Sequence, residues 1–417
     1  MEAEEERAKA TLRYLKAKFG QYYKSHPLRL PPRFGRREFG FIFFDGGFVQ
    51  RHLGFASEAD LYSFVLSRLP AHLYHSAAYY ESPGAPTMAE KGWMGADLIF
   101  DLDADHIPGW KEMGYKGMLE AVKEQVIRLI DEYLVGDLGF RERDMTIAFS
   151  GARGYHIHIR NPKVLTLESH ERREIVDYIT GTDLDLEQIA RSEPFEVRSY
   201  KERTRTLKRL RIPTPSEPGW RGRAARGIIG WLDQVSRLPE EDALREIRRL
   251  EGVGKVKAQR IYDTMFKRLG RTQALDRVRG GVLDLFPKSG GLSLAAQGAD
   301  LMKGATDEPV TSDIKRLIRL IGSLHGKTGF MVVSLTRDGL EDFDPLLEAI
   351  PDHYSHEKIR LHLPKGIKTD MMGETFNLKP GQNSVPEYLA IFMMCRGMAT
   401  LASGTPYEGT LEPESGP

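Results

Sequence analysis

The hydrophobic pattern near the N-terminus predicts a helix, a hairpin, a second helix and a strand. Residues 1–26 begin acidic and become amphipathic, which is typical of a surface helix rather than a cleaved leader. In Glu38–Phe55, two aromatic-rich runs flank Asp-Gly-Gly, a turn sequence that predicts a β-hairpin. Ser57–Pro70 has helical spacing with Ser57 as its N-cap, and Ala71–Ser82 is typical of a strand.

Further along, the pattern divides the chain into a mixed core and an insertion. A helical period over Lys111–Gly139 leads into two strands, Asp144–Gly151 and Gly154–Asn161. From about Leu165 to Leu285 the sequence is helical by pattern and rich in arginine and lysine. Strand character returns in Phe330–Leu335, and helical character in Val385–Ala402. We therefore predict an α/β (α+β) protein with a discontinuous core (1–164 and 286–402), a helical, basic insertion (165–285) and a disordered C-terminal tail (403–417).

Composition excludes several classes of protein. The 417 residues are enough for two or three domains, each with a core of its own. The formal net charge is +1, so nucleic-acid binding must be argued from local patches rather than from overall charge. The single cysteine, Cys395, excludes a disulfide framework and a four-cysteine zinc site within the chain. No apolar run approaches the ~18 residues of a membrane span, so we expect a cytoplasmic protein without a membrane partner.

One apolar run, Leu98–Phe100, passes directly into three aspartates, Asp101, Asp103 and Asp105. A strand directs alternate side chains to one face, with successive Cα atoms on that face about 6.6 Å apart. Like charges this close repel, so either the strand ends in water or the carboxylates hold a cation. Because the intervening residues are apolar, we favour a site for Mg²⁺ or Mn²⁺, two of which can clamp an in-line phosphoryl transfer.

The glycine-rich turn Ser150–Gly154 is a candidate anion site. Its glycines permit a tight turn with backbone N–H groups free for an anion, and Arg153 adds a guanidinium. His156 and His158 follow on one face of the next strand. The plainer alternative is a glycine turn followed by two half-exposed histidines. Zinc binding through His-x-His is a further alternative, although no nearby cysteine completes such a site.

A second cationic, glycine-rich stretch spans Thr306–Phe330. Its Gly-Lys-Thr does not form a phosphate-binding P-loop, because Ile321 stands where that motif requires glycine. What remains is a basic turn beside an acid, with a solvated loop after a basic helix as the alternative. The charged residues of this stretch are Asp307, Lys315, Arg316, Arg319, His325 and Lys327.

The predicted insertion carries its own basic run and a short hairpin-like motif. Such a run usually forms a solvated helix face, although it could also follow a nucleic-acid backbone. Leu250–Tyr262 has the look of a helix-hairpin-helix turn, for which a plain helical hairpin is the more common explanation. The basic run consists of Arg198, Lys201, Arg203, Arg205, Lys208, Arg209 and Arg211, opposed only by Glu202.

Taken together, these motifs resemble the small catalytic subunit of archaeal-eukaryotic DNA primase, and the archaeal form most closely. The resemblance runs from about Tyr14 to Leu401, with the motifs in the family's order. It implies a primase-type core of mixed and antiparallel sheets with an RRM-like unit. The motifs that carry it are "REFGF" at Arg37–Phe41, "FDLDADH" at Phe100–His106, "SGARGYHIHI" at Ser150–Ile159, and "DEPVTSDIKRLIRLIGSLHGKTG" at Asp307–Gly329.

The resemblance also implies roles for individual residues. Asp101 and Asp103 would be the metal-binding pair on the core strand, with Asp307 as the third carboxylate, and Asp105 would sit in the turn. Two Mg²⁺ or Mn²⁺ ions would activate a primer 3′-OH and neutralise the triphosphate during attack on the α-phosphate, releasing pyrophosphate. The residues expected to bind the nucleotide are Arg51, Ser150, Arg153, His156, Arg319, His325 and Lys327.

The sequence departs from the family at two positions. Many members carry a cysteine-rich zinc knuckle soon after the aspartate strand, where this chain has "GWKEMGYKGM" without cysteine. The only other histidine group that could hold zinc is His106 with His156 and His158, which would compete with the triphosphate, so we expect no zinc. Ile321 also replaces a usual proline.

We therefore expect a nucleotidyltransferase that starts chains de novo on single-stranded DNA from nucleoside triphosphates, together with a primase large subunit. The runner-up is an enzyme of the same superfamily that extends or repairs ends without priming. A third possibility is a non-catalytic nucleic-acid binder with an RRM-like core, which would need stacking aromatics and no acidic triad.

Overall fold

The computed structural model describes residues 2–107, 109–200 and 203–402, and the tail predicted at 403–417 lies outside the described residues. The chain forms two compact units. The discontinuous unit is Met1–Val176 with Ala305–Pro417, and the inserted unit is Asp177–Gly304. An insertion was expected from the sequence, but at 165–285, so both of its ends differ from the observed division.

The first sheet of the discontinuous unit has the strand order β11-β3-β1-β2. Its aromatic core takes residues from α1, α2 and the sheet, among them Phe19, Phe41 and Val65, none of which is exposed to solvent. The predicted hairpin is confirmed as β1 and β2, and Ser57 caps α2 in a full capping box. The elements are α1 (Glu2–Ser25), β1 (Phe39–Ile42), β2 (Gln50–Leu53), α2 (Glu58–Arg68), β3 (His72–Ser76) and β11 (Leu317–Arg319).

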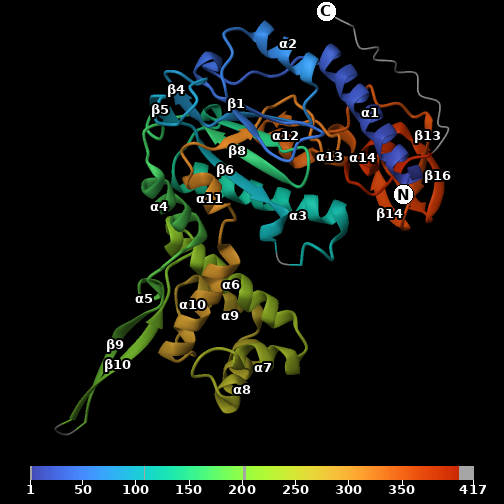
Figure 1. The fold of residues 1–417 in the computed structure, drawn as a ribbon. Helices are drawn as coiled ribbons and strands as arrows, with labels where there is room; N and C mark the ends of the chain where they lie inside the picture. Colours follow the sequence, from blue (N-terminus) through green and yellow to red (C-terminus); the bar gives the residue numbers. More distant parts are fainter. Residues whose placement is uncertain (1, 108, 201–202, 403–417) are drawn as a thin grey trace, which may run out of the picture. The chain divides into compact units, whose positions relative to one another are not determined.

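The second sheet has the order β12-β7-β8-β6 and holds the aspartate strand (Figure 1). Phe100 and Leu102 of β6 point into the core, while Asp101 and Asp103 lie on the opposite face, as the alternation predicted. In the antiparallel pairing with β8, Asp101 lies directly opposite His156. The elements are β6 (Leu98–Asp103), α3 (Gly114–Arg128) with a π-helical continuation (Leu129–Asp137), β7 (Met145–Phe149), β8 (Gly154–Ile159) and β12 (Val333–Leu335).

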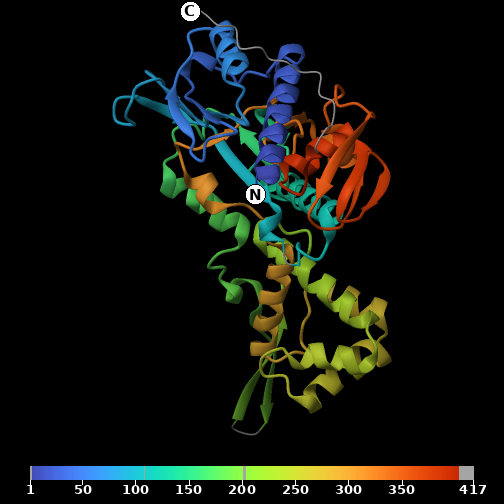
Figure 2. The same ribbon diagram turned by 45° about the vertical axis from the view of Figure 1, so that its right-hand side comes forward.

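The C-terminal part of the discontinuous unit contains strands that the sequence did not predict. The helix predicted within Val385–Ala402 is confirmed as α14 (Glu387–Cys395), and α1 runs alongside α14 and the neighbouring strands (Figures 1 and 2). The sheet order here is β16-β13-β17, with β14 and β15 forming a separate ribbon. The strands are β13 (Lys358–Leu363), β14 (Ile367–Met371), β15 (Glu374–Leu378), β16 (Gly381–Pro386) and β17 (Thr400–Leu401).

The remaining short elements of the discontinuous unit connect these layers. β4 and β5 form a two-stranded ribbon next to the first sheet, so the single strand predicted over Ala71–Ser82 is two strands, β3 and β4. α4 (Ser169–Thr180) begins in this unit and ends in the inserted one. The others are β4 (Ala78–Tyr80), β5 (Trp93–Ala96), α11 (Glu308–Ser312), α12 (Arg337–Asp342) and α13 (Pro345–Glu348).

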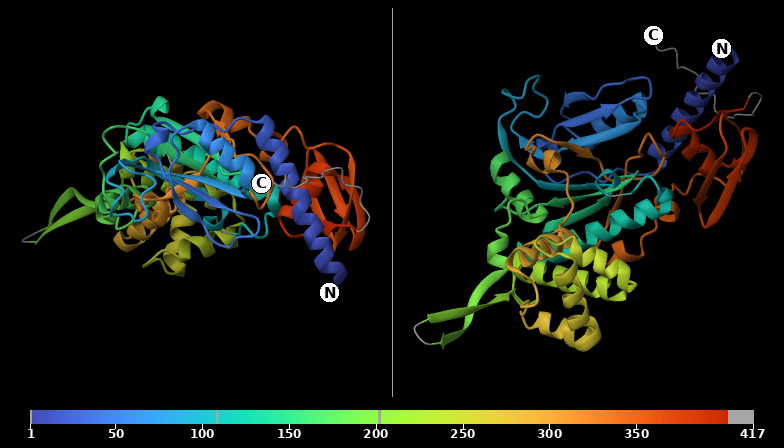
Figure 3. Two further views of the ribbon diagram at one scale, coloured as in Figure 1. Left: turned by 45° about the horizontal axis from the view of Figure 1, so that its top comes forward. Right: turned by 90° about the horizontal axis from the view of Figure 1, so that it is seen from below.

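The inserted unit is mostly helical but contains one long hairpin (Figure 3). Its core is formed chiefly by α6 packed against α10, with α7, α8 and α9 around them. Gly252, with φ +70°, lies in the turn between α7 and α8, where the hairpin-like motif was recognised. The elements are α5 (Leu186–Ile189), β9 (Arg191–Tyr200), β10 (Arg203–Arg211), α6 (Gly219–Arg237), α7 (Glu240–Arg248), α8 (Lys255–Tyr262), α9 (Arg271–Arg279) and α10 (Lys288–Met302).

The helical prediction for the basic run was wrong, because the run forms β9 and β10. These strands pair antiparallel from Arg191–Arg211 to Tyr200–Arg203, with an irregular register near Pro194. Proline and alternating threonines disfavour a helix interior and are tolerated in a two-stranded ribbon with a bulge. Lys201 and Glu202 lie outside the described residues.

The predicted fold class is confirmed. Helices and strands are mixed along the chain, and every strand pairing among the described residues is antiparallel. Within residues 2–107, 109–200 and 203–402, no helix is both long and apolar enough to cross a membrane.

Candidate active site

Three aspartates from two distant segments of the chain lie near the end of β6. Asp101 and Asp103 belong to β6, and the backbone N–H of Asp307 donates a hydrogen bond of 2.9 Å to the carbonyl oxygen of Asp101. Asp307 stands at the N-cap position of α11, yet its side chain makes no capping hydrogen bond. Its carboxylate therefore remains available for another partner.

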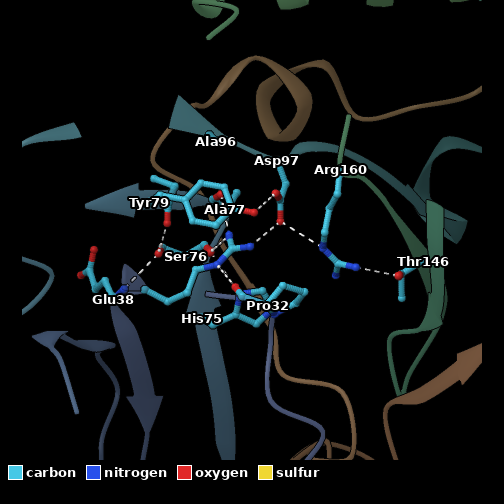
Figure 4. A network of polar contacts seen from close by, with 12 residues as sticks. Pro32, Glu38, His75, Ser76, Ala77, Tyr79, Ala96, Asp97, Thr146 and Arg160 are labelled. Carbon is cyan, nitrogen blue, oxygen red and sulfur yellow. Dashed lines mark hydrogen bonds and ion pairs between the residues drawn. The ribbon is translucent and has the colours of Figure 1, made fainter. Parts of the chain in front are cut away.

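Asp97, which immediately precedes β6, and Asp101, within it, have opposite surroundings. Asp97 is fully buried and has several cationic or hydroxyl partners: Arg37 Nη2 at 2.7 Å, Tyr79 Oη at 2.6 Å and Arg160 Nε at 3.5 Å (Figure 4). The Asp101 side chain is one-fifth exposed, and the nearest basic group recorded for it is His156 Nε2 at 3.4 Å. The negative charge of Asp97 is thus compensated within the protein, whereas that of Asp101 is not.

This lack of compensation raises the pKa of Asp101 to about 7. Burial is the largest cause, followed by the negative charges of Asp103 and Asp307, while Arg316 and Arg319 act in the opposite direction. A carboxylate with such neighbours favours either a proton or a cation. A raised pKa of this kind is typical of a carboxylate cluster that binds a cation.

His156 faces Asp101 as a neutral imidazole. Burial, with help from Arg319 and Arg316, lowers the pKa of His156 to about 3. Its Nδ1 is buried and has no hydrogen-bond partner. A neutral ring in this position can donate one hydrogen bond without adding positive charge to the carboxylate cluster.

A hollow of about 230 Å³ joins the acids to the two glycine-rich turns. Acidic groups form one wall, and arginines and histidines form the other, so the hollow suits a ligand that carries both metal ions and phosphates. The lining residues are Tyr74, Asp101, Asp103, Ser150, Gly154, His156, Arg316, Leu317, Ile318, Arg319 and His325.

The two glycine-rich turns interlock beside this hollow. The Thr328 hydroxyl donates to the carbonyl oxygen of Gly151, which joins the second turn to the first. Gly151 has φ +82°, and a Cβ placed on it would lie 2.7 Å from the Cβ of His325. Only glycine fits at this position without displacing one of the turns. The contact joins motifs that are far apart in the sequence.

Arg319 is held in place by a histidine that the sequence did not indicate. Arg319 Nη1 donates to His72 Nδ1 over 2.7 Å, and the backbone N–H of Gly326 donates to the same nitrogen over 3.2 Å. Burial, Arg319 and Lys327 lower the pKa of His72 to about 3, so the ring is neutral and can accept both hydrogen bonds. His72 thereby fixes the guanidinium and the second turn together. Arg319 itself belongs to strand β11, not to the basic helix considered from the sequence.

Three of the expected nucleotide-binding residues do not line the hollow. Arg51 forms a two-pronged ion pair with the buried Glu38, through Nε at 3.0 Å and Nη2 at 3.2 Å. Arg153 bridges Asp103 and Asp105, with its Nη2 at 3.2 and 3.0 Å. The Lys327 side chain is exposed. Arg153 pairs with the lining residue Asp103, whereas the recorded partners of Arg51, Glu38 and the Lys315 carbonyl, do not line the hollow.

Three residues of this region were not predicted from the sequence to belong to the site: two line the hollow, and one contacts the lining residue Arg319. Tyr74 and Arg316 line the hollow, and His72 lies behind Arg319. Arg316 was noted only as part of a basic stretch. Tyr74 and His72 lie on one face of β3, where period-2 spacing could have paired them, but nothing in the sequence shows that β3 adjoins β11.

The residues present fit a hard divalent cation at the acids. The negative charge of Asp101 has no cationic partner of its own within the protein, and the side chain of Asp307 makes no capping hydrogen bond at the start of α11. Carboxylate oxygens of this kind suit Mg²⁺ or Mn²⁺. Among the described residues, these three carboxylates do not form a single cluster with all ligand atoms within 4.8 Å. That separation is compatible with two ions, each held by a subset of the acids.

His158 is stacked on His75 rather than grouped with a metal ligand, and the side chain of His106 is not described.

Comparison with known proteins decides the family. A family profile described as DNA primase small subunit matches residues 100–337, which is more than half of the chain. The chain belongs to the DNA primase small-subunit family. The resemblance inferred from the motifs is therefore confirmed.

Full-length relatives agree with this assignment. A DNA primase small subunit PriS from Methanocella arvoryzae is 44% identical over 399 residues, covering 93% of this chain and 98% of the relative. The protein of the same name from Methanothrix thermoacetophila is 41% identical, with the same coverage. That from Halobacterium salinarum is 40% identical over 96% of this chain and all of the relative. The primase small-subunit match includes all three acids and both glycine-rich turns, whereas Arg51 lies outside it.

Proposed function

We propose that this chain is the catalytic subunit of a DNA primase. It synthesises short primers de novo on single-stranded DNA from nucleoside triphosphates, for DNA replication. The observation that carries the proposal is the hollow that Asp101, whose charge lacks a cationic partner of its own, lines together with Asp103, Arg316 and Arg319. Family membership supplies the substrate class, because the relatives are named as DNA primase small subunits.

In this proposal Asp101, Asp103 and Asp307 hold two Mg²⁺ or Mn²⁺ ions. Such ions activate a 3′-hydroxyl and neutralise charge on the triphosphate during in-line attack on the α-phosphate. Asp101 and Asp103 share the face of β6 opposite Phe100 and Leu102, and the backbone of Asp307 is hydrogen-bonded to the backbone of Asp101. Asp101 and Asp103 line the hollow, whereas Asp307 lies next to Asp101 without lining it.

The opposite wall binds the triphosphate in our proposal. Arg319 supplies a half-buried guanidinium whose pKa is lowered mainly by burial, and a charge-assisted hydrogen bond is strong in such surroundings. Ser150 and His325 bring the two turns to the same wall. His156 stays neutral beside Asp101 and can donate to a phosphate oxygen. Arg51, Arg153 and Lys327 would act from the rim of the hollow.

Synthesis on unprimed single-stranded DNA tests the proposal. The assay compares ribo- and deoxynucleoside triphosphates, with Mg²⁺ or Mn²⁺, for the chain alone and with a primase large subunit. We expect new chains that begin without a primer and that disappear with Asp101→Asn. Synthesis by that variant equal to the parent's would contradict the two-metal assignment.

A polymerase that only extends ends is the second candidate. The same acids and the same nucleotide wall would serve it equally well, so the site does not distinguish the two activities. A matched assay with primed and unprimed templates does distinguish them. Extension of the primed template only, even with the large subunit present, would favour the second candidate. A non-catalytic binder with an RRM-like core is disfavoured by the acidic wall itself.

A further inference from the structure

A second group of candidate metal ligands lies away from the acids. His26, Asp352 and His353 each offer one ligand atom, and these atoms all lie within 4.8 Å of one another. Among the described residues this is the only such group of three. His26 follows the end of α1, whereas Asp352 and His353 lie between α13 and β13. All belong to the discontinuous unit.

Backbone carbonyls orient both imidazoles. His26 Nδ1 lies 3.2 Å from the carbonyl oxygen of Tyr22, and His353 Nε2 lies 3.3 Å from that of Lys18. A carbonyl oxygen can only accept, so His353 Nε2 donates to it, and His26 Nδ1 can donate to the Tyr22 carbonyl or to the Ser25 hydroxyl, which lies 2.9 Å away. With the proton on that nitrogen, the other nitrogen of each ring can offer its lone pair to a metal. Metal-binding histidines are commonly held in this way, with the second nitrogen bonded to a carbonyl.

The two remaining ring nitrogens lie close to a third possible ligand atom or have no partner. His26 Nε2 lies 3.0 Å from Asp352 Oδ1. His353 Nδ1 is buried and has no hydrogen-bond partner. Two neighbouring ligands of a tetrahedral zinc ion, with bonds of about 2.0–2.1 Å, are themselves roughly 3.3 Å apart. The His26–Asp352 spacing is therefore close to that of two ligands on one ion.

We propose that His26 Nε2, His353 Nδ1 and an oxygen of Asp352 bind one Zn²⁺ ion. Solvent would take the fourth position, since three protein ligands leave one open in a tetrahedral site. Nitrogen and oxygen ligands of this kind suit zinc better than Mg²⁺, which prefers oxygen alone. The Asp352 side chain is 86% exposed, so it can rotate toward the ion at little cost.

The ion would fasten α1 to the C-terminal part of the discontinuous unit. α1 already contacts that part through Lys18 Nζ, 2.7 Å from the buried carboxylate of Glu387. Zinc at His26 adds a second attachment, near the end of the helix. The site is separate from the hollow described above, and it revises the expectation from sequence that the chain binds no zinc. The sequence could not indicate it, because its ligands come from opposite ends of the chain.

Zinc binding by the full chain, stripped of metal and then titrated with Zn²⁺ alone, tests the inference. We expect one Zn²⁺ per chain by elemental analysis and calorimetry, and a higher melting temperature with zinc. His26→Gln and His353→Gln should each weaken zinc binding at least about 10-fold and abolish the rise in melting temperature. His170→Gln is the matched control, because His170 is 70% exposed and belongs to no such group.

The readouts do not depend on catalysis, so failure of this inference is distinct from failure of the proposed function. Zinc retained by His26→Gln and His353→Gln but lost by His156→Gln would place the ion at the catalytic histidines and overturn the inference. Absence of stoichiometric zinc in the parent chain would equally overturn it.

Discussion

The backbone N–H of Asp307 donates to the carbonyl oxygen of Asp101 over 2.9 Å. This single contact brings the third acid beside the first without involving either side chain. The contact leaves both carboxylates available to a ligand, with His156 Nε2, 3.4 Å away, as the nearest basic group to Asp101. An Asn at either position should preserve the fold, because it changes only the charge and the ligand strength of the side chain.

Asp101→Asn and Asp307→Asn should each reduce nucleotide incorporation by about 10²-fold or more, since even outer partners of metal ligands contribute 10–100-fold. Steady-state primer synthesis with Mg²⁺ and with Mn²⁺ measures the loss. Asp105→Asn is the control, because Asp105 lies in the turn after β6 and pairs with Arg153. A loss for Asp105→Asn as large as for the other two would show that charge in this region, rather than metal ligation, is what matters.

Asp101 should also destabilise the metal-free protein at neutral pH. Its folded-state pKa, about 7, lies above the ordinary value of 3.8, so the folded state binds the proton more tightly than the unfolded state. Stability from this group is therefore present at low pH and is lost as the pH rises from about 4 to 7. Asp101→Asn should raise the melting temperature at pH 8, by roughly 2–4 °C for each kcal/mol released.

Melting curves at pH 5 and pH 8, recorded without divalent metal, check this expectation. The gain of the variant should be larger at pH 8 than at pH 5, and added Mn²⁺ should stabilise the parent but not the variant. Asp103→Asn is a useful comparison, because Arg153 and the backbone N–H of Ala104 already compensate the Asp103 carboxylate. An Asp101→Asn variant that melts lower than the parent at pH 8 would contradict the prediction that the charge of Asp101 destabilises the metal-free protein.

The sequence was informative wherever a motif is local. Alternation along Leu98–Asp103 predicted which face carries the acids, and the Ser57 cap followed from its position before a helical pattern. The sequence did not indicate contacts between residues that lie on different segments of the chain. Nothing local shows that His72 accepts from Arg319, or that Arg37 neutralises Asp97. Those pairings arise from the way the sheets pack, which a pattern along one segment does not contain.

The basic hairpin shows a different failure. Residues 191–211 were assigned to a helix because charge and composition dominated the pattern, whereas Pro194 and the threonines of β10 favour a ribbon. The strands between Lys358 and Pro386 were missed because they are short and mostly polar, so their burial depends on α14 and β17. Propensity is a weak guide where tertiary contacts decide the outcome.

Replacing His72 should weaken nucleotide binding through Arg319. His72→Leu removes the acceptor shared by Arg319 and the backbone of Gly326, so we expect the KM for nucleotide to rise roughly 10-fold, in line with one charge-assisted hydrogen bond. Template affinity should not change. His72→Asn keeps an acceptor at a similar position and should restore most of the loss. Equal effects of Leu and Asn on KM would indicate a packing role instead.

Gly151→Ala should separate the two glycine-rich turns. The new Cβ would lie 2.7 Å from that of His325, and φ +82° is unfavourable for alanine by about 1–2 kcal/mol. We expect lower stability in urea and weaker nucleotide binding in the same variant. Gly35→Ala is the control, because a Cβ there meets nothing within 4 Å. Wild-type nucleotide affinity in Gly151→Ala would show that the contact between the turns does not shape the site.

The last prediction concerns the buried ion pair between Arg37 and Asp97, the residue that precedes β6. Arg37 is fully buried and donates to Asp97 at 2.7 Å and to the carbonyl oxygens of Ser76 and Ala77 at 2.8 and 2.7 Å. Arg37→Met would leave the Asp97 charge without its main partner, while the Ala77 carbonyl oxygen would keep its hydrogen bond from the backbone N–H of Asp97 at 2.9 Å. Breaking one side of such a pair typically costs 3–5 kcal/mol, so we expect a loss of about that size in urea unfolding.

Two further variants distinguish the ion pair from simple loss of packing. Lys9→Met removes an exposed pair with Glu5 and should change stability by less than about 1 kcal/mol. Adding Asp97→Asn to Arg37→Met removes the unpaired charge and should recover part of the loss, because the remaining amide can still bond to Tyr79. A double variant no more stable than Arg37→Met alone would show that the cost lies in the volume of the arginine and not in the charge that it neutralises.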